Sequence, residues 1–411
     1  MIEIALGTLI ILALVLALTA ALLFARARLL PQGAATITLN GTQEIEVQSG
    51  ETLLSCLQGA GFAIPAGCGG KGTCGLCRVT ATGPGAGEAL AAERGLLSAR
   101  DRKAGMRLAC QVTLKGPVNV EVAPDLLSAE TMQATVRSNR MLAPLIRELV
   151  LDLPEGQKMD FHAGYFMQLT APAYRLSFRD IEVSERFAET WEDAGWRDLS
   201  ARSAAPVTRA YSIASRPEDV GRAVFNIRLA VPPAGAEGEI PPGLVSSYLF
   251  ALKPGDPLAI SGPFGEFRVQ DTQAEMILIG GGVGMAPLRA MIHEQVGREQ
   301  ESKGAPRKMR YFYGARSAID LFYTEEFDAI AAAHPNFRWT PALSDPAPGD
   351  RWTGATGFIH ERVADALRDH PAPNACEYYL CGPPMMISAV IATLMRFGVE
   401  RHRIYNDDFG A

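Results

Sequence analysis

The sequence contains no long run of lysine or arginine, no internal repeat and no low-complexity tract. Its 411 residues carry 39 Lys and Arg against 45 Asp and Glu, which gives a net charge of −6 at pH 7. A chain with this balance is not expected to have nucleic acid as its main partner. With 48% hydrophobic residues the chain can bury a substantial core, and its length predicts two to four domains.

Charge is absent from one long stretch near the N-terminus, Ile4–Ala25. As a helix this stretch would be about 33 Å long, enough to cross a bilayer core of roughly 30 Å. A cleaved signal peptide would instead need a basic start and a shorter apolar segment. Arg26 and Arg28 follow the stretch, and the positive-inside rule then places the rest of the chain in the cytoplasm. We therefore predict a transmembrane anchor at residues 2–25, followed by a linker at 26–34.

Histidine is scarce and the cysteines are odd in number, which limits the metal and disulfide arrangements available. Three of the seven cysteines, Cys68, Cys74 and Cys77, lie in the segment PAGCGGKGTCGLC, and Cys110 stands alone. In a reducing cytoplasm disulfides are a poor default. Structural zinc usually takes two closely spaced ligand pairs, whereas three clustered cysteines with a distant fourth resemble plant-type ferredoxins. The pattern favours a [2Fe–2S] cluster over zinc.

The glycines around these cysteines support the same interpretation. The sulfur atoms of a cluster carry negative charge, which needs hydrogen-bond donors. A loop rich in glycine can turn its backbone N–H groups toward the metal; the residues concerned are Gly69, Gly70, Gly72 and Gly75. Cys56 lies in a predicted helix before the loop and is expected to be a small core residue.

Hydrophobic patterning divides the rest of the chain into three folded parts. Residues 35–125 begin with a hairpin predicted from Asn40-Gly41. Residues 130–272 contain short, regularly spaced strands and one helix, which predicts an antiparallel β-barrel. Residues 273–411 alternate strands and helices, as in a doubly wound α/β sheet. The segment 171–208 fits neither pattern: it is a solvated insertion or, through its two tryptophans Trp191 and Trp196, a partner-docking surface.

Three short motifs suggest phosphate binding. GGGVGMAP (Gly280–Pro287) follows an apolar strand and opens a helix, so a pyrophosphate could approach its backbone and the helix N-terminus. GLVSSY (Gly243–Tyr248) offers a second helix N-terminus with two hydroxyl groups. RAYS (Arg209–Ser212) taken alone could equally be an ordinary exposed strand, and a single glycine-rich turn is a weak signal.

RAYS, GLVSSY, GGGVGMAP and CGPP occur in the order found in the ferredoxin–NADP reductase-like flavoproteins. With the ferredoxin-like cysteines, the N-terminal helix and the ending DDFGA, the whole chain resembles the F subunits of bacterial Na+-translocating NADH:quinone oxidoreductases. The resemblance implies an α+β β-grasp ferredoxin domain, an FAD-binding barrel and an NADH-binding α/β domain. It implies FAD and a [2Fe–2S] cluster as cofactors and NADH as the substrate.

The resemblance also assigns roles to individual residues. Arg209 would pair with the FAD pyrophosphate, because a guanidinium fork suits phosphate, and Tyr211 would lie against the isoalloxazine ring. The other expected cofactor contacts are Gly243, Ser246 and Ser247 for FAD, and Gly282, Gly284, Pro287, Gly382 and Pro383 for NADH. The residues expected at the hydride-transfer site are Ser212, Cys381 and Phe409. The expected cluster ligands are Cys68, Cys74, Cys77 and Cys110.

This interpretation implies an electron path from NADH through FAD and the cluster to a partner membrane subunit. Hydride transfer needs no acid–base pair, so none of the six histidines is expected to be catalytic, and His360 is expected to be structural. No acid ends the second strand of the nucleotide domain, and Arg316 there could favour NADPH, although the family implies NADH. Sodium transport would belong to other subunits in the bacterial inner membrane, because one uncharged helix in contact with lipid offers no ion path. Quinone would also be reduced by another subunit.

Two other functions are compatible with the residues. The reductase component of a bacterial oxygenase would share the same modules from residue 35 onward, but such reductases are soluble, so the Ile4–Ala25 stretch discriminates against it. A membrane-tethered, non-enzymatic sensor of metal and nucleotide would be colourless and would contain stoichiometric zinc.

Overall fold

A computed structural model describes residues 12–19, 21, 33–122, 131–157, 159–233, 235–236, 238–301 and 306–408. The chain falls into two compact units, Met1–Ser128 and Ala129–Ala411. Residues 12–19 are helical, but within the described ranges no helix is long and apolar enough to cross a membrane. Most of the predicted anchor and linker lies outside these ranges, as does Phe409.

The first unit is built around a five-stranded mixed sheet in the order β2-β1-β5-β3-β4. Its elements are β1 (Ala34–Leu39), β2 (Gln43–Gln48), α2 (Leu53–Gly59), β3 (Arg78–Thr82), α3 (Ala91–Leu96), α4 (Ala99–Lys103), β4 (Met106–Leu108) and β5 (Val118–Glu121). β1 and β2 form the predicted hairpin, and Asn40 and Gly41 at its turn have positive φ angles. The sheet shares its core with α2, where Cys56 is buried as expected.

A buried ion pair ties α3 to β4. Arg107 Nε and Nη2 donate to the two carboxylate oxygens of Glu93 at 2.9 and 3.0 Å, and the Leu108 N–H donates to the same carboxylate at 2.9 Å. Burial by itself raises the pKa of Glu93, but Arg107 and the backbone donors lower it below its ordinary value. Cys110 lies two positions after Leu108, so the ion pair fixes the strand from which that cysteine extends.

The second unit begins with a six-stranded antiparallel sheet in the order β11-β8-β13-β6-β7-β12. Its elements are β6 (Thr131–Ala143), β7 (Ile146–Asp152), β8 (Phe166–Ala171), β11 (Val207–Ser212), β12 (Arg222–Arg228), α7 (Leu244–Ala251) and β13 (Pro257–Phe264). An isolated bridge between Ile213 and Phe225 joins the two ends of the sheet. The sheet therefore closes into an antiparallel barrel, as predicted.

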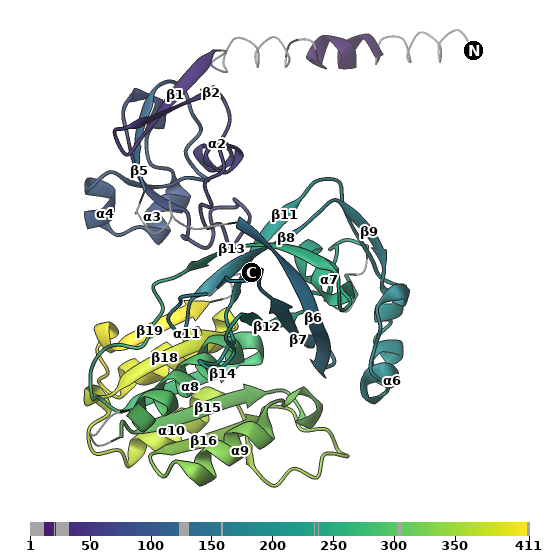
Figure 1. Cartoon of the computed structure of the whole chain (residues 1–411), viewed down its shortest axis with the longest axis vertical. Helices are drawn as coiled ribbons and strands as arrows, with labels where there is room; N and C mark the ends of the chain where they lie inside the picture. The colour runs from purple at the N-terminus through teal and green to yellow at the C-terminus, as the bar shows by residue number, and fades with distance from the viewer. Residues whose placement is uncertain are drawn as a thin grey trace. The chain divides into compact units, whose positions relative to one another are not determined.

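The segment 171–208 contributes to the core of this barrel. It contains β9 (Tyr174–Ser177), α6 (Glu185–Asp193) and β10 (Ser200–Ser203), and Figure 1 shows β9 and α6 beside α7. The Trp191 side chain is fully buried, donates to Pro144 O at 2.7 Å and stacks on Phe250 with 6.3 Å between ring centroids. The expectation that Trp191 forms an exposed docking surface is therefore wrong, because its indole is an interior side chain.

The C-terminal part of this unit is a six-stranded parallel sheet in the order β17-β16-β15-β14-β18-β19. Its elements are β14 (Met276–Gly281), α8 (Met285–Glu301), β15 (Met309–Ala315), α9 (Thr324–Ala333), β16 (Phe337–Leu343), β17 (Ala355–Thr356), α10 (Ile359–Arg368), β18 (Glu377–Gly382), α11 (Pro384–Arg396) and β19 (Ile404–Asp408). α8 and α9 share a core with one face of the sheet, and α10 and α11 with the other. The strand order reverses between β14 and β18, and doubly wound sheets bind ligands at the carboxyl ends of the strands there.

Replacing Arg107 with methionine should destabilise the first unit strongly, because the Glu93 carboxylate would stay buried without its partner. Such a loss costs about 3–5 kcal/mol, which lowers the melting temperature of a domain of this size by more than about 10 °C. Thermal unfolding of the full chain, followed by circular dichroism, measures this. Arg100→Met, at an exposed position on α4, is the control, and an equal shift in both variants would contradict the role of the ion pair.

Candidate redox sites

Four cysteines of the first unit come together as two pairs. Cys68, Cys74 and Cys77 lie in the loop between α2 and β3, and Cys110 follows β4. The Cys68 thiol interacts with that of Cys74, and the Cys77 thiol interacts with that of Cys110. The backbone N–H of Cys68 also donates to the Cys74 sulfur at 3.4 Å. The structure thus brings together all four cysteines that the sequence predicts as ligands.

The loop directs backbone N–H groups at these sulfur atoms. The donors are Thr73 and Cys74 to Cys68, Leu76 to Cys74, and Gly72 to Cys110. The glycines with positive φ are Gly69, Gly70, Gly72 and Gly75, as predicted. At Gly72 a Cβ would also lie 2.5 Å from the Gln111 amide nitrogen. A side chain there would disturb both the turn and the residue next to Cys110.

These hydrogen bonds bring two of the thiols toward their charged form. Burial by itself raises the pKa of Cys68, but the backbone donors Thr73 and Cys74 outweigh it and lower that pKa to about 6. The Cys77 thiol lowers the pKa of Cys110 to about 7, while Cys110 raises that of Cys77. Each pair therefore contains one cysteine that readily forms the thiolate, which is the form that binds metal.

A [2Fe–2S] cluster suits this arrangement better than a single zinc ion does. The cluster is held by four cysteines shared between two irons, whereas structural zinc gathers four ligands around one centre. In the described part of the chain, one group of three metal-ligating side chains has its atoms within 4.8 Å of one another, and it includes none of these cysteines. Two pairs of thiols that also interact with each other, surrounded by N–H donors, fit the cluster.

The predicted flavin contacts Arg209, Tyr211 and Ser212 lie on β11. The Arg209 guanidinium donates to Thr208 O at 2.8 Å, and no carboxylate among the described residues forms an ion pair with it, so it remains available to an anion. Burial raises the pKa of Tyr211 and keeps its phenol neutral. Ser212 Oγ lies 3.5 Å from Asp407 Oδ2 on β19. The end of the barrel strand therefore meets the carboxyl edge of the parallel sheet.

A second candidate for phosphate binding is the N-terminus of α7. Gly243 precedes the helix and provides no side-chain cap, so the first N–H groups of α7 are open to an anion. Ser246 Oγ donates to Gly243 O and accepts from Ala230 N, both at 3.2 Å. The Ser247 hydroxyl is fully buried and interacts with the Tyr174 hydroxyl. These features fit a bound phosphate group.

The glycine turn after β14 and the CGPP turn after β18 pack directly on each other where the strand order reverses. A Cβ at Gly284 would lie 2.0 Å from Cys381 O, so packing between the turns requires this glycine. Gly282 has a φ of +56° and open space where a Cβ would be, which leaves room for a ligand. The two glycines predicted to contact a pyrophosphate therefore differ in role. Gly284 allows the two turns to pack closely, whereas Gly282 faces open space.

The other predicted nucleotide contacts differ in exposure. Gly382 and Cys381 are buried at the end of β18, and Pro383 is exposed at the start of α11. Pro287 is buried in the first turn of α8, where proline is well tolerated because its missing N–H has no helical partner. Phe409 lies outside the described residues. Pro383 is therefore exposed at the carboxyl end of the sheet, whereas the Cys381 side chain and the Pro287 ring are part of the core.

Arg316, at the end of β15, forms an ion pair with Asp345, which is 29 positions away in the sequence. Its Nη2 atom lies 3.1 Å from Asp345 Oδ2, and both side chains are exposed. The ion pair engages the arginine that could otherwise bind a 2′-phosphate.

Sequence reasoning missed Arg289, a buried arginine of α8 that joins the parallel sheet to the barrel. Its guanidinium donates to Glu326 at 2.6 and 3.0 Å, and to Ala214 O, two residues beyond Ser212, at 2.7 Å. It also lies 4.5 Å from the centroid of the Tyr323 ring. Glu326 and Ala214 are 37 and 75 positions from Arg289. No local pattern could therefore have revealed this set of contacts, the Arg289 network.

The Glu326 carboxylate of this network stays ionised. Burial raises its pKa, but hydrogen bonds from His293 and Arg289 outweigh burial and lower the pKa to about 2. A depressed carboxylate pKa stabilises the fold above the ordinary value of about 4.3, and that contribution is lost as the pH falls toward 2. The ion pair between Arg289 and Glu326 is therefore fully charged at neutral pH.

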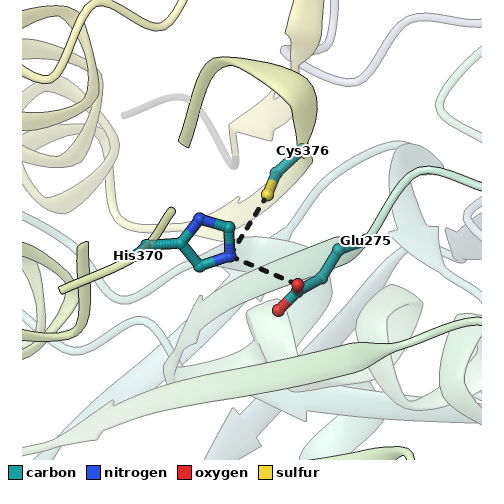
Figure 2. Close-up of side chains that lie close together, drawn as sticks. All are labelled: Glu275, His370 and Cys376. Carbon is teal, nitrogen blue, oxygen red and sulfur yellow. Dashed lines mark hydrogen bonds and ion pairs between the residues drawn. The ribbon is translucent and has the colours of Figure 1, made fainter. Parts of the chain in front are cut away.

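One other cluster of metal-ligating groups lies at the amino edge of the parallel sheet, and Figure 2 shows its members Glu275, His370 and Cys376. His370 Nε2 lies 3.2 Å from Glu275 Oε2 and 3.7 Å from Cys376 Sγ. His370 Nδ1 accepts the Ala372 N–H at 3.2 Å, so Nε2 carries the ring proton and donates to Glu275. Burial raises the pKa of Cys376 to about 11. With ring nitrogen and thiol both protonated, this is a structural hydrogen-bond cluster.

Three family models match successive parts of the chain. A 2Fe-2S iron-sulfur cluster binding domain matches residues 37–115, an oxidoreductase FAD-binding domain matches 198–269, and an oxidoreductase NAD-binding domain matches 278–391. The paired cysteines, the strand β11 and the two glycine turns fall within these matches in that order. The residues therefore agree with binding of a [2Fe–2S] cluster, FAD and NADH.

Relatives match the chain from end to end. It is 45% identical to the F subunit of the Na(+)-translocating NADH-quinone reductase of Methylococcus capsulatus over 100% of both chains. It is 43% identical to the corresponding F subunit of Neisseria meningitidis over 99% of this chain and 100% of that one. Among solved structures, the Amycolatopsis cytochrome P450 reductase is 26% identical, with a TM-score of 0.63 over 91% of this chain and 98% of its own. The ferredoxin reductase of carbazole 1,9a-dioxygenase, 24% identical, with a TM-score of 0.59 over 92% and 99%, shares the fold.

Arg289→Lys should slow hydride transfer to the flavin, because it keeps the charge but loses the guanidinium fork that holds Glu326 and Ala214 together. A displacement of about 1 Å between reacting groups can cost roughly 100-fold in rate. We expect flavin reduction by NADH, measured by stopped-flow absorption, to slow about 10- to 100-fold, with the bound FAD content unchanged.

Arg298→Lys is the matched control, since Arg298 lies on the same helix in an exposed pair with Glu294. Its rate of flavin reduction should equal that of the wild type. Equal rates in wild type and Arg289→Lys would contradict an aligning role for the Arg289 network.

Proposed function

The chain belongs to the family of Na(+)-translocating NADH-quinone reductase F subunits, and we propose that it is the electron-input subunit of such a complex. It oxidises NADH and delivers the electrons singly, through its [2Fe–2S]-binding unit, to a partner membrane subunit. The observation that carries this proposal is that one chain, aligned with these relatives over its whole length, contains the paired cysteines, the uncapped α7 N-terminus and the open glycine turn.

FAD, when bound, accepts a hydride and passes on single electrons. The protein supplies binding and alignment. Arg209 and the N-terminus of α7 bind the FAD phosphates, and Tyr211 presents a neutral aromatic ring to the flavin. Gly282 would give the NADH pyrophosphate access to the backbone, and Ser212 and Cys381 would lie beside the flavin and nicotinamide rings. Hydride transfer needs no side chain to take up or release a proton.

The four paired cysteines hold the cluster in the first unit. Cys68 and Cys110, whose pKa values are lowered, would supply thiolate ligands to the cluster, and the backbone N–H groups of the loop donate to the cysteine sulfur atoms. Such hydrogen bonds raise the reduction potential of a cluster, because they stabilise the added negative charge. The loop therefore both holds the cluster and sets how readily it accepts an electron.

The alternative function, reductase of an oxygenase, is less well supported. The solved reductases with a similar fold are 24–26% identical to this chain, whereas the quinone-reductase subunits are 43–45% identical over its whole length. Those relatives also align with the N-terminal residues that the proposed anchor occupies. The non-enzymatic sensor is disfavoured because the relatives aligned over the whole chain are subunits of an NADH-quinone reductase.

We further propose that residues 2–25 cross the bacterial inner membrane once, with the rest of the chain in the cytoplasm. The support is the uncharged stretch Ile4–Ala25, followed directly by Arg26 and Arg28. The name of the relatives places them in a quinone reductase with several subunits. An anchor of this kind would keep the cluster-binding unit close to its electron acceptor and to membrane lipid.

Anaerobic titration of the full-length protein with NADH tests the electron path. We expect the flavin absorption bands to bleach, followed by the one-electron EPR signal of a reduced [2Fe–2S] cluster. Cys77→Ser should keep the flavin bleaching and lose the EPR signal, because it removes one ligand. Cys56→Ser, at a buried cysteine outside the site, should keep both. A bleached flavin without any cluster signal in the wild type would refute the proposed path.

Fractionation of cells that express the chain alone tests the anchor. The full-length chain should stay with the membranes after a high-salt wash, because an apolar helix is not released by screening charge. A variant that begins at Arg28 should appear in the soluble fraction with its flavin and cluster intact. A full-length chain that is washed off the membranes would show that residues 2–25 do not span the bilayer.

A further inference from the structure

The side chain of Tyr313 on β15 reaches the glycine turn that follows β14. Its hydroxyl donates to Gly282 O at 3.1 Å, and the two residues are 31 positions apart in the sequence. The Tyr313 side chain is buried, and its ring packs edge-on against that of Phe322 with 5.9 Å between centroids. Because packing fixes the ring, the hydroxyl is a hydrogen-bond donor held at one place against the turn.

The Tyr313 phenol stays neutral and keeps its proton for this bond. Burial raises its pKa above the ordinary value, and Asp320 and Tyr323 raise it further. The Gly282 carbonyl also accepts the Met285 N–H at the start of α8. A carbonyl oxygen has two lone pairs and can accept both hydrogen bonds at once. One side chain and one backbone group therefore hold this carbonyl together.

The direction of the Gly282 carbonyl decides where the next N–H group points. The peptide bond between Gly282 and Val283 is trans and planar, so its N–H points away from its carbonyl. The Val283 N–H belongs to the short helical turn Gly282–Gly284 that opens α8, and the first N–H groups of a helix have no partner within it. The hydrogen bond from Tyr313 thus turns the Val283 N–H to the side opposite the buried tyrosine.

The second tyrosine on the same face of β15 makes a different kind of contact. The Tyr311 hydroxyl lies 3.1 Å from Met285 Sδ and is also buried. A thioether is a weak acceptor and belongs to a side chain. Tyr311 therefore supports the packing of α8, whereas Tyr313 acts on the backbone of the turn itself.

We propose that Tyr313 is a positioning residue for the pyrophosphate of NADH: its hydroxyl fixes the peptide between Gly282 and Val283 so that the Val283 N–H donates to a phosphate oxygen. This inference rests on the proposed function, which assigns the glycine turn to that pyrophosphate. Tyr313 acts through the backbone and does not itself contact the nucleotide. A donor at the carbonyl also polarises the peptide and strengthens the hydrogen bond that its N–H makes. Without the hydroxyl, part of the binding free energy would be spent on ordering the turn.

Tyr313→Phe tests the proposal, because it removes the hydroxyl and keeps the ring. Full-length protein loaded with FAD, in detergent, is mixed with NADH in a stopped-flow instrument, and the rate of flavin reduction is followed as the NADH concentration is varied. The Kd for NADH should rise about 3- to 10-fold, as expected for one lost hydrogen bond, while the limiting rate stays within about twofold of the wild type. The Kd for ADP-ribose, measured by calorimetry, should rise by the same factor, since this probe carries the pyrophosphate without the nicotinamide.

Tyr378→Phe is the matched control. Tyr378 is fully buried near the amino end of β18, and its hydroxyl donates to a backbone carbonyl, Pro373 O, at 2.8 Å. The variant therefore loses a buried hydrogen bond of the same kind away from the glycine turn. Its melting temperature should fall about as much as that of Tyr313→Phe, and both of its Kd values should equal those of the wild type.

The remaining outcomes each have a distinct meaning. Unchanged Kd values for NADH and ADP-ribose in Tyr313→Phe would overturn the inference. A slower limiting rate with unchanged Kd values would also overturn it, because the hydroxyl would then act on the alignment of the rings. Equal losses of affinity in Tyr313→Phe and Tyr378→Phe would overturn it as an effect of packing alone. A wild-type protein whose flavin is not reduced by NADH would instead overturn the proposed function.

Discussion

The guanidinium of Arg289 connects the barrel and the parallel sheet of the second unit, and the proposed alignment of flavin and nucleotide depends on this connection. Two of its N–H groups donate to the Glu326 carboxylate on α9, and a third donates to Ala214 O, two residues beyond the end of β11. Because the arginine is buried, separating the halves would leave a charge without a partner, which is costly. Hydride transfer needs the reacting atoms about 3–3.5 Å apart. A rigid connection between strand β11 and helix α8 is the contribution that the protein itself makes to this alignment.

The cluster-binding unit uses the same device at a different place. Arg107, three positions before Cys110, forms a buried ion pair with Glu93. In the same way Ala214, which accepts from Arg289, lies two positions after Ser212. In both cases a buried guanidinium fixes the strand that leads into or out of the site, while the proposed cofactor contacts are backbone N–H groups, small residues and, on β11, Arg209 and Tyr211. The ion pairs that stabilise the fold, Arg107–Glu93 and Arg289–Glu326, are thus separate from the groups proposed to bind cofactors. The cofactor-binding groups therefore remain available to a ligand.

The parts of the structure that the sequence predicts are those set by local pattern. The Asn40-Gly41 hairpin, the positive φ angles of the cysteine loop and the parallel sheet after residue 275 all follow from neighbouring residues. The Arg289 network and the burial of Trp191 could not be predicted, because they depend on partners many positions away. Gly284 shows that a motif can predict the residue type for the wrong reason. The glycine-rich pattern suggested a ligand contact, but a glycine is required there because a Cβ would collide with Cys381 O. The anchor and Phe409 lie outside the described residues and stay predictions.

The parallel sheet separates structural chemistry from binding chemistry by its two edges. At the amino edge Arg307 pairs with Glu377, and Glu275 contacts both His370 and Arg310, so the titratable groups there have partners inside the protein. At the carboxyl edge the turns are glycine and backbone with little side chain. A cluster of ligand-type residues is therefore weak evidence for a site when its hydrogen bonds are complete, as at His370.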